Sequence, residues 1–282
     1  MLPSTRIARG AAGGVRVNRD RPIGVFDSGI GGLTVAHALM SALPNERIVY
    51  FGDTARLPYG TKSSATVAGY AAQITDFLLK RDVKMLVVAC NTMAAVALSV
   101  VTSLSPVPVV DVLDAGARAA VESSRSGRIG VLATLTTVSS QAYERAIRAH
   151  ARDARIVSQA CPLFAPLVEE GWLDHPVTEL TAREYLQPVL AEKVDTLVLG
   201  CTHYPLLKPL LARLVGPATR LVDSAETTAA RVADLLAARD LCRTAPEEPM
   251  HEYYVTDLPQ RFRAVGALCL GRPLPEVQLV HW

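Results

Sequence analysis

The sequence predicts an α/β protein with two similar parallel-sheet domains, related by pseudo-two-fold symmetry, and an active site in the cleft between them. Short apolar runs alternate with helical segments, which is typical of βαβ units. Residues 87–92 and 197–203 resemble each other, because each places one cysteine and a polar pair after an apolar run. A chain of 282 residues exceeds the usual limit of a single core, so two domains are expected.

The first predicted domain alternates strands and helices from residue 21 onward. Its strands are β-branched or Leu-rich runs too short for helices, which indicates buried parallel strands. A glycine-rich turn at residues 27–34 leads into the first helix. The expected elements are a strand at 23–26, a helix that ends near residue 43, a strand at 48–51, a polar loop at 52–60, a helix at 64–80, a strand that ends at Cys90 and a strand at 107–112.

The same pattern restarts near residue 115 and predicts a second domain. Its expected elements are a helix, a strand at 128–132, a polar turn with a helix, a short strand at 156–159, a helical stretch at 164–192 that Pro166, Pro176 and Pro188 break, a strand before Cys201, a strand at 221–223 and a helix at 226–238. The tail from residue 246 contains strand-like residues 253–256 and is expected to pack against the first domain. The predicted division is residues 21–113 and 223–282 for the first domain and residues 114–222 for the second.

The composition excludes several classes of protein. A net charge of +2 argues against a dedicated nucleic-acid binder. The five cysteines are widely spaced and form no CxxC pair, so we expect no disulfide framework, no metal and a cytoplasmic location. Polar side chains interrupt the longest apolar stretch, residues 85–101, so no membrane span is expected. Residues 1–20, rich in arginine and small residues, are predicted to be a disordered basic leader.

The turn that begins at Asp27 and Ser28 is the first candidate site. Its glycines let the backbone approach a ligand closely, and the following helix start offers free N–H groups to an anion such as a carboxylate. The alternative is a plain helix cap at Asp27 or Ser28.

The two cysteine segments are the second and third candidate sites. Thiols past the ends of parallel strands lie where open α/β sheets bind ligands, and two matched thiols suit a reaction with a base on one face and an acid on the other. Asn91 and Thr92 after Cys90 need polar partners, which a ligand can supply, although a free cysteine is often only a small buried apolar group. His203 after Cys201 could orient or protonate a nearby group, and a partial metal site is the alternative there.

Four segments carry a resemblance to a known family. They are residues 24–35, residues 52–54 with 58–60, residues 89–92 and residues 199–207. In this order they resemble the glutamate racemases of the aspartate/glutamate racemase family, over about residues 21–240. The sequence departs from the family's usual pattern at Ala133, where glycine is common, and at residues 111–116, which lack a proline before the glycine.

The resemblance implies a cofactor-independent racemase that interconverts L- and D-glutamate, for peptidoglycan precursors and hence cell-wall biogenesis and cell shape. Cys90 would take the α-proton from D-glutamate, and Cys201 would take it from L-glutamate. Asp27 and His203 would assist these thiols, with the Glu169 carboxylate behind the second. The implied substrate-binding residues are Asp27, Ser28, Asp53, Pro58, Tyr59, Gly60, Asn91, Thr92, Thr134, Thr137, Thr202 and His203. The implied partners are glutamate and a second copy of the chain, with no need of nucleic acid or a membrane.

Other functions stay open at this point. An aspartate or hydantoin racemase of the same two-thiol group differs in the size of its pocket. A two-domain protein that binds a small acid without turning it over is a different class, although binding alone does not require two thiols. A regulatory protein that has kept the fold is a third. Without the resemblance, Glu169 and the three remaining cysteines are expected to be structural or solvated.

Overall fold

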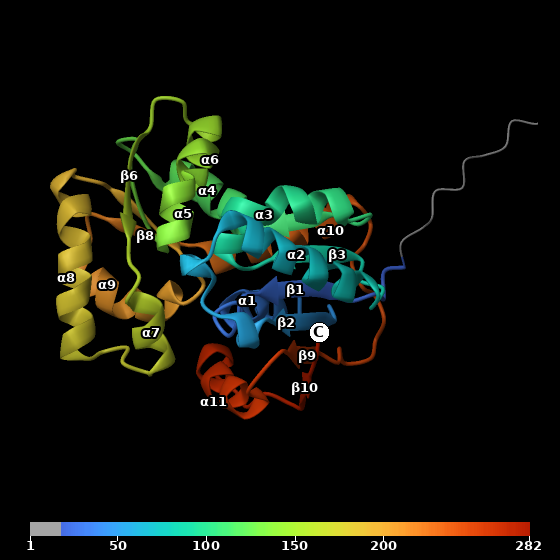
Figure 1. The fold of residues 1–282 in the computed structure, drawn as a ribbon. Helices are drawn as coiled ribbons and strands as arrows, with labels where there is room; N and C mark the ends of the chain where they lie inside the picture. Colours follow the sequence, from blue (N-terminus) through green and yellow to red (C-terminus); the bar gives the residue numbers. More distant parts are fainter. Residues whose placement is uncertain (1–17) are drawn as a thin grey trace, which may run out of the picture.

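A computed structural model describes residues 18–282, and it contains two parallel β-sheets flanked by helices (Figure 1). The predicted fold class is confirmed, because every strand pairing in both sheets is parallel. Residues 1–17 of the predicted leader lie outside the described part of the chain. No helix in the described chain is long and apolar enough to cross a membrane.

The first sheet has six strands in the order β10-β9-β2-β1-β3-β4. Its central strands are fully buried runs of apolar residues, as expected for parallel strands covered on both faces. The strands are β1 (Ile23–Asp27), β2 (Ile48–Gly52), β3 (Met85–Val88), β4 (Val109–Asp111), β9 (Glu252–Val255) and β10 (Val277–Leu279). The C-terminal tail therefore adds β9 beside β2, which confirms its predicted packing against the first domain.

The second sheet repeats the strand order of the first. Its four strands run in the order β6-β5-β7-β8, which matches β2-β1-β3-β4 strand for strand. They are β5 (Arg128–Ala133), β6 (Arg155–Ala160), β7 (Thr196–Gly200) and β8 (Arg220–Asp223). Cys90 lies two residues past the end of β3 and Cys201 directly follows β7, so the two cysteines occupy corresponding places in the two halves.

Helices connect the strands, and several of them begin at a capping side chain. The Ser63 side chain accepts a hydrogen bond from an N–H in the first turn of α2, and Asp111 and Asp223 do the same for α4 and α10. The α-helices are α1 (Leu33–Ala42), α2 (Ser64–Leu79), α3 (Asn91–Leu104), α4 (Val112–Ser123), α5 (Leu135–Ser140), α6 (Ala142–His150), α7 (Phe164–Glu169), α8 (Pro176–Ala191), α9 (Lys208–Val215), α10 (Ser224–Ala238) and α11 (Pro259–Leu270). Short 3-10 turns occur at Thr54–Arg56, Tyr59–Thr61 and Tyr204–Leu207.

The prediction that three prolines break residues 164–192 is wrong at two of them. Pro166 lies inside α7, and Pro188 lies inside α8, which continues to Ala191. Pro188 lacks the N–H that would donate to the Glu184 carbonyl, and α8 continues for only three residues beyond it. Pro176 does start a new helix at its first position, as the fixed φ of proline favours.

The two halves pack through helices at their junction. Helix α10 contacts both α1 of the first half and α4, which leads into the second. One buried apolar cluster continues from the first sheet to Ile129, Tyr143 and Val198 of the second half. A separate cluster lies beneath α7 and α8, and Figure 1 shows α8 on the side of the second sheet remote from the first. The two strand-end regions that carry the cysteines are thereby held next to each other.

Candidate active site

A cavity of about 150 Å³ brings the two cysteine segments together. It is lined from the first half by the turn after β1, the loop after β2 and the start of α3, and from the second half by the segments after β5, β6 and β7. The predicted residues that line it are Ser28, Pro58, Tyr59, Gly60, Cys90, Asn91, Thr92, Thr134, Glu169, Cys201, Thr202 and His203. Both cysteines therefore line one cavity.

Several lining residues were not predicted from the sequence. They are Leu57, Thr61, Leu135, Pro162, Ala165 and Pro166. Most are apolar residues or prolines, which give no chemical signal in a sequence. Three predicted residues do not line the cavity. Asp27 directly precedes Ser28, which does, and Asp53 and Thr137 are hydrogen-bonded to the lining residues Tyr59 and Thr134.

Cys90 caps helix α3 with its sulfur. The Sγ accepts a hydrogen bond from the Met93 N–H at 3.5 Å, and 5% of the residue is exposed. Burial raises the pKa of the Cys90 thiol to about 12, and the negative charge of Asp27 adds to this, while hydrogen bonds from Met93 and Ser28 oppose it. Cys90 is therefore a protonated thiol at neutral pH.

Asp27 is fully buried, and only one of its two carboxylate oxygens has hydrogen-bond partners in the described part of the chain. Its Oδ2 accepts hydrogen bonds from the Gly29 N–H at 3.0 Å and the Gly32 N–H at 2.9 Å. Its Oδ1 has no hydrogen-bond partner in the described part of the chain. The helix-cap alternative is wrong, because the N-cap of α1 is Gly32 and no side chain in the described part of the chain caps that helix. One oxygen of Asp27 instead fixes the turn before α1, and the other is left without a hydrogen bond.

Cys201, His203 and Glu169 form a hydrogen-bonded row. The Cys201 sulfur lies 3.8 Å from Nδ1 of His203, and Nε2 of His203 lies 3.0 Å from Oε1 of Glu169. Burial acts to lower the pKa of His203, but hydrogen bonds and charge from Cys201 and Glu169 together raise it to about 10. Burial acts to raise the pKa of Glu169, but its hydrogen bond to His203 and the charges of His203 and Arg261 lower it overall. The row is an imidazolium between a sulfur and a carboxylate.

Polar groups from both halves meet at another wall of the cavity. The hydroxyls of Thr92 and Thr134 lie 2.9 Å apart, and Thr134 lies 2.9 Å from Thr137. The Asn91 Oδ1 accepts a hydrogen bond from the Tyr143 hydroxyl at 2.6 Å, while its Nδ2 is buried without a partner among the described residues. The Asn91 amide therefore keeps two N–H donors without a partner among the described residues, and Asn91 lines the cavity. Tyr143, on α6, gave no signal in the sequence.

The two halves touch closely on either side of this cavity. A Cβ on Gly31 would lie 2.4 Å from Oγ1 of Thr202 and 2.6 Å from Nδ1 of His203. A Cβ on Gly60 would lie 2.9 Å from Cβ of Thr134. The Thr34 hydroxyl also donates to the Thr202 carbonyl, with 3.1 Å between the oxygens. Glycine is needed at these contacts because a side chain would separate the walls.

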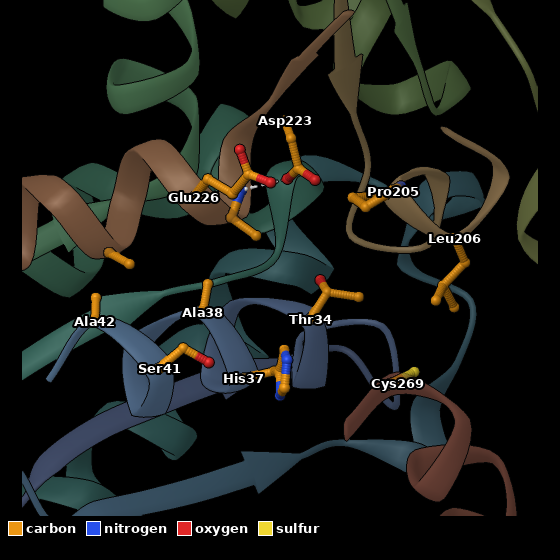
Figure 2. Close-up of a pocket in the computed structure, with 12 residues that line it drawn as sticks. Thr34, His37, Ala38, Ser41, Ala42, Pro205, Leu206, Asp223, Glu226 and Cys269 are labelled. Carbon is orange, nitrogen blue, oxygen red and sulfur yellow. Dashed lines mark hydrogen bonds between the residues drawn. The ribbon is translucent and has the colours of Figure 1, made fainter. Parts of the chain in front are cut away.

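A larger groove of about 570 Å³ lies beside the junction of the halves, but it contains neither Cys90 nor Cys201 (Figure 2). Among its polar residues, Asp223 caps α10 through the Ala225 N–H and lies 3.6 Å from the ammonium group of Lys208. Within residues 18–282, no group of three or more His, Cys, Asp or Glu side chains is arranged to hold a metal ion. The smaller cavity is therefore the candidate active site.

Comparisons with known proteins point to one family. A family model described as Asp/Glu/Hydantoin racemase matches residues 33–232. A glutamate racemase of Syntrophus aciditrophicus is 61% identical over 260 residues, which cover 92% of this chain and 96% of that protein. The crystal structure of glutamate racemase from Francisella tularensis in complex with D-glutamate is similar with a TM-score of 0.88 and 40% identity, over 93% of this chain and 98% of the other. The crystal structure of a glutamate racemase from Bacillus anthracis is similar with a TM-score of 0.91 and 36% identity, over 94% of this chain and 98% of the other.

Proposed function

Since the chain belongs to the Asp/Glu/hydantoin racemase family, we propose that it interconverts L- and D-glutamate by moving the α-proton between two thiols, Cys90 and Cys201. The chain is an isomerase that acts on glutamate. Two relatives, which match 92% and 94% of its length, are named glutamate racemase. The predicted family and enzyme class are thereby confirmed. The observation that supports two thiols is that both cysteines, from corresponding places in a repeated strand order, line one cavity.

Racemisation needs one group on each face of the α-carbon. The C–H bond breaks on one face as its proton moves to a thiolate, and a new C–H bond forms on the other face as a thiol gives up its proton. The electron pair of the broken bond is held in between as a carbanion conjugated with the α-carboxylate. Two thiols suit these roles because sulfur can be either acid or base with modest tuning.

The surroundings of the two sulfurs support different starting roles. The high pKa of Cys90 keeps its proton in place, which suits an acid. The His203 imidazolium, 3.8 Å from the Cys201 sulfur, stabilises negative charge there, which suits a base. In this protonation form Cys201 would take a proton while Cys90 gives one, and the reverse form would exchange the two roles. The resemblance to the family assigns L-glutamate to the first form and D-glutamate to the second. Asp27, whose negative charge acts on Cys90, and Glu169, which is hydrogen-bonded to His203, would assist.

Hydrogen-bond donors along the wall would hold the substrate carboxylates. The unpaired Nδ2 of Asn91 is one donor, and the hydroxyls of Ser28, Thr92 and Thr134 line the same cavity. Donors fixed in a dry site stabilise the charge that spreads onto the α-carboxylate, each by about 3 kcal/mol. Thr202 and the segment from Pro58 to Gly60 would complete the binding wall, with Asp53 and Thr137 acting from behind it.

The wider setting is also proposed. We assign residues 21–113 and 223–282 to one domain and 114–222 to the other, because the strands of each range build separate sheets. The reaction would need no cofactor, and D-glutamate would supply peptidoglycan precursors. Five free cysteines fit a reducing, cytoplasmic setting, and a homodimer is expected.

Proton NMR in deuterated water tests the proposal. Purified protein with D-glutamate and no added cofactor should lose the α-proton signal while L-glutamate forms in a chiral assay. Activity should survive dialysis against a chelator and treatment with a carbonyl-trapping reagent. Persistence of the α-proton with glutamate, but its loss with aspartate or a hydantoin, would contradict the assigned substrate.

Replacing Glu169 with glutamine should shift the pH profile. The carboxylate raises the pKa of His203, so its loss lets His203 give up its proton at lower pH. We expect the alkaline limb of kcat/KM for L-glutamate, set near pH 10 in the wild type by this group, to move to lower pH. Rates from both enantiomers should be measured across the alkaline range.

Glu170→Gln is the matched control, since the adjacent Glu170 is exposed and pairs with Arg261 at 3.4 Å. Its alkaline limb should match that of the wild type. An unchanged limb in Glu169→Gln, or an equal shift in both variants, would contradict the role of Glu169.

A further inference from the structure

The buried carboxylate of Asp53 links the C-terminal segment to the wall of the active-site cavity. The wall includes Tyr59, which lies on the loop after β2 and is 1% exposed. Thr256 directly follows β9, outside the residues 33–232 that the family model matches. Asp53 lies between them, fully buried and outside the cavity lining.

Asp53 joins the loop after β2 to the C-terminal segment. Its Oδ2 accepts hydrogen bonds from Nε of Arg56 at 2.6 Å and from the Tyr59 hydroxyl. Its Oδ1 accepts one from the Thr256 hydroxyl at 3.0 Å. The Thr256 oxygen in turn accepts a hydrogen bond from the Ala55 N–H at 2.9 Å. Thr256 thus uses both of its hydrogen-bonding capacities on the loop that contains Tyr59.

Further contacts hold the C-terminal segment to the same loop. The Thr54 hydroxyl donates to the Asp257 carbonyl at 2.6 Å and accepts from the Asp257 N–H at 2.8 Å. The Arg56 guanidinium lies 4.9 Å from the ring centroid of Trp282 and 4.1 Å from that of Tyr70. The end of the chain therefore packs over the Arg56 guanidinium, whose positive charge balances the Asp53 carboxylate.

We infer that Thr256 is a positioning residue, which sets the Tyr59 wall of the cavity through Asp53. The inference rests on the proposed function, because Tyr59 and Gly60 are assigned there to substrate binding. The Tyr59 proton is committed to Asp53, so Tyr59 offers its ring and backbone to the substrate rather than its hydroxyl. Without the Thr256 hydroxyl, Asp53 loses the donor to Oδ1 and can rotate, and Tyr59 moves with it.

Thr256→Val tests this role, because valine keeps the shape and removes the hydroxyl. Loss of one charge-assisted hydrogen bond should raise KM for glutamate by about tenfold, with kcat within about twofold of the wild type. Thr256→Ser should restore KM. The control is Thr75→Val, a fully buried threonine whose hydroxyl donates to Ala71 within α2. Its KM should stay at the wild-type value.

Hydrogen exchange without substrate separates this inference from the proposed function. Amides of residues 54–61 should exchange faster in Thr256→Val than in the wild type, and Thr75→Val should leave them unchanged. If the wild type does not racemise glutamate, the proposed function fails, while faster exchange still supports the positioning role. Wild-type KM and exchange in Thr256→Val, or a change in kcat alone, would overturn the inference.

Discussion

Replacing Cys90 or Cys201 with serine is expected to abolish racemisation of glutamate. A serine hydroxyl is far less acidic than a thiol, so it neither gives nor takes the α-proton at neutral pH. Losing one acid–base group should lower kcat by about 10²–10⁴-fold in both directions. Steady-state rates from L- and D-glutamate measure this loss. Turnover at the wild-type rate in either variant would contradict the two-thiol mechanism.

Each single variant should keep one-sided chemistry. Elimination from a glutamate with a leaving group on its β-carbon needs one base, because the electron pair of the α C–H bond forms a double bond and expels the leaving group. Cys90→Ser retains Cys201 and should eliminate from the L enantiomer, and Cys201→Ser should eliminate from the D enantiomer. Cys242→Ser is the control, since Cys242 does not line the cavity. The opposite enantiomer preference would reverse the assigned roles.

Gly31→Ala should inactivate the protein without removing any chemical group. The added Cβ would lie 2.4 Å from Oγ1 of Thr202 and 2.6 Å from Nδ1 of His203, so these side chains or the two halves must shift. A displacement of about 1 Å in such a site can cost about 10²-fold, and we expect kcat/KM to fall by this order. The decrease should appear for both enantiomers, because both reactions use the same cavity.

Gly69→Ala provides the matched control. Gly69 lies on α2 with no atom within 4 Å of its added Cβ, so alanine there should keep full activity and stabilise the helix by about 0.5–1 kcal/mol. Circular dichroism of both variants should match the wild type. Full activity in Gly31→Ala would show that the close contact with His203 is not needed.

Local patterns in the sequence were enough to predict most strands and helices. The predicted strands at 23–26, 48–51 and 221–223 each lie within an observed strand that is one residue longer. Helix α11, which packs against α1 and β10, was not predicted from the sequence. Pro188 was misjudged because a proline does not always end a helix at its own position, and α8 continues for three residues beyond it.

The amino-acid sequence established the two cysteine segments, their neighbours and the parallel-strand fold, because apolar strands and the polar residues after them are local signals. The meeting of both halves in one cavity, the hydrogen bond of Tyr143 to Asn91 and the contact of Thr256 with Asp53 depend on packing between distant segments. Neither Tyr143 nor Thr256 stands in a distinctive motif. Their roles arise because a repeated order of parallel strands brings loops far apart in the chain to the same place.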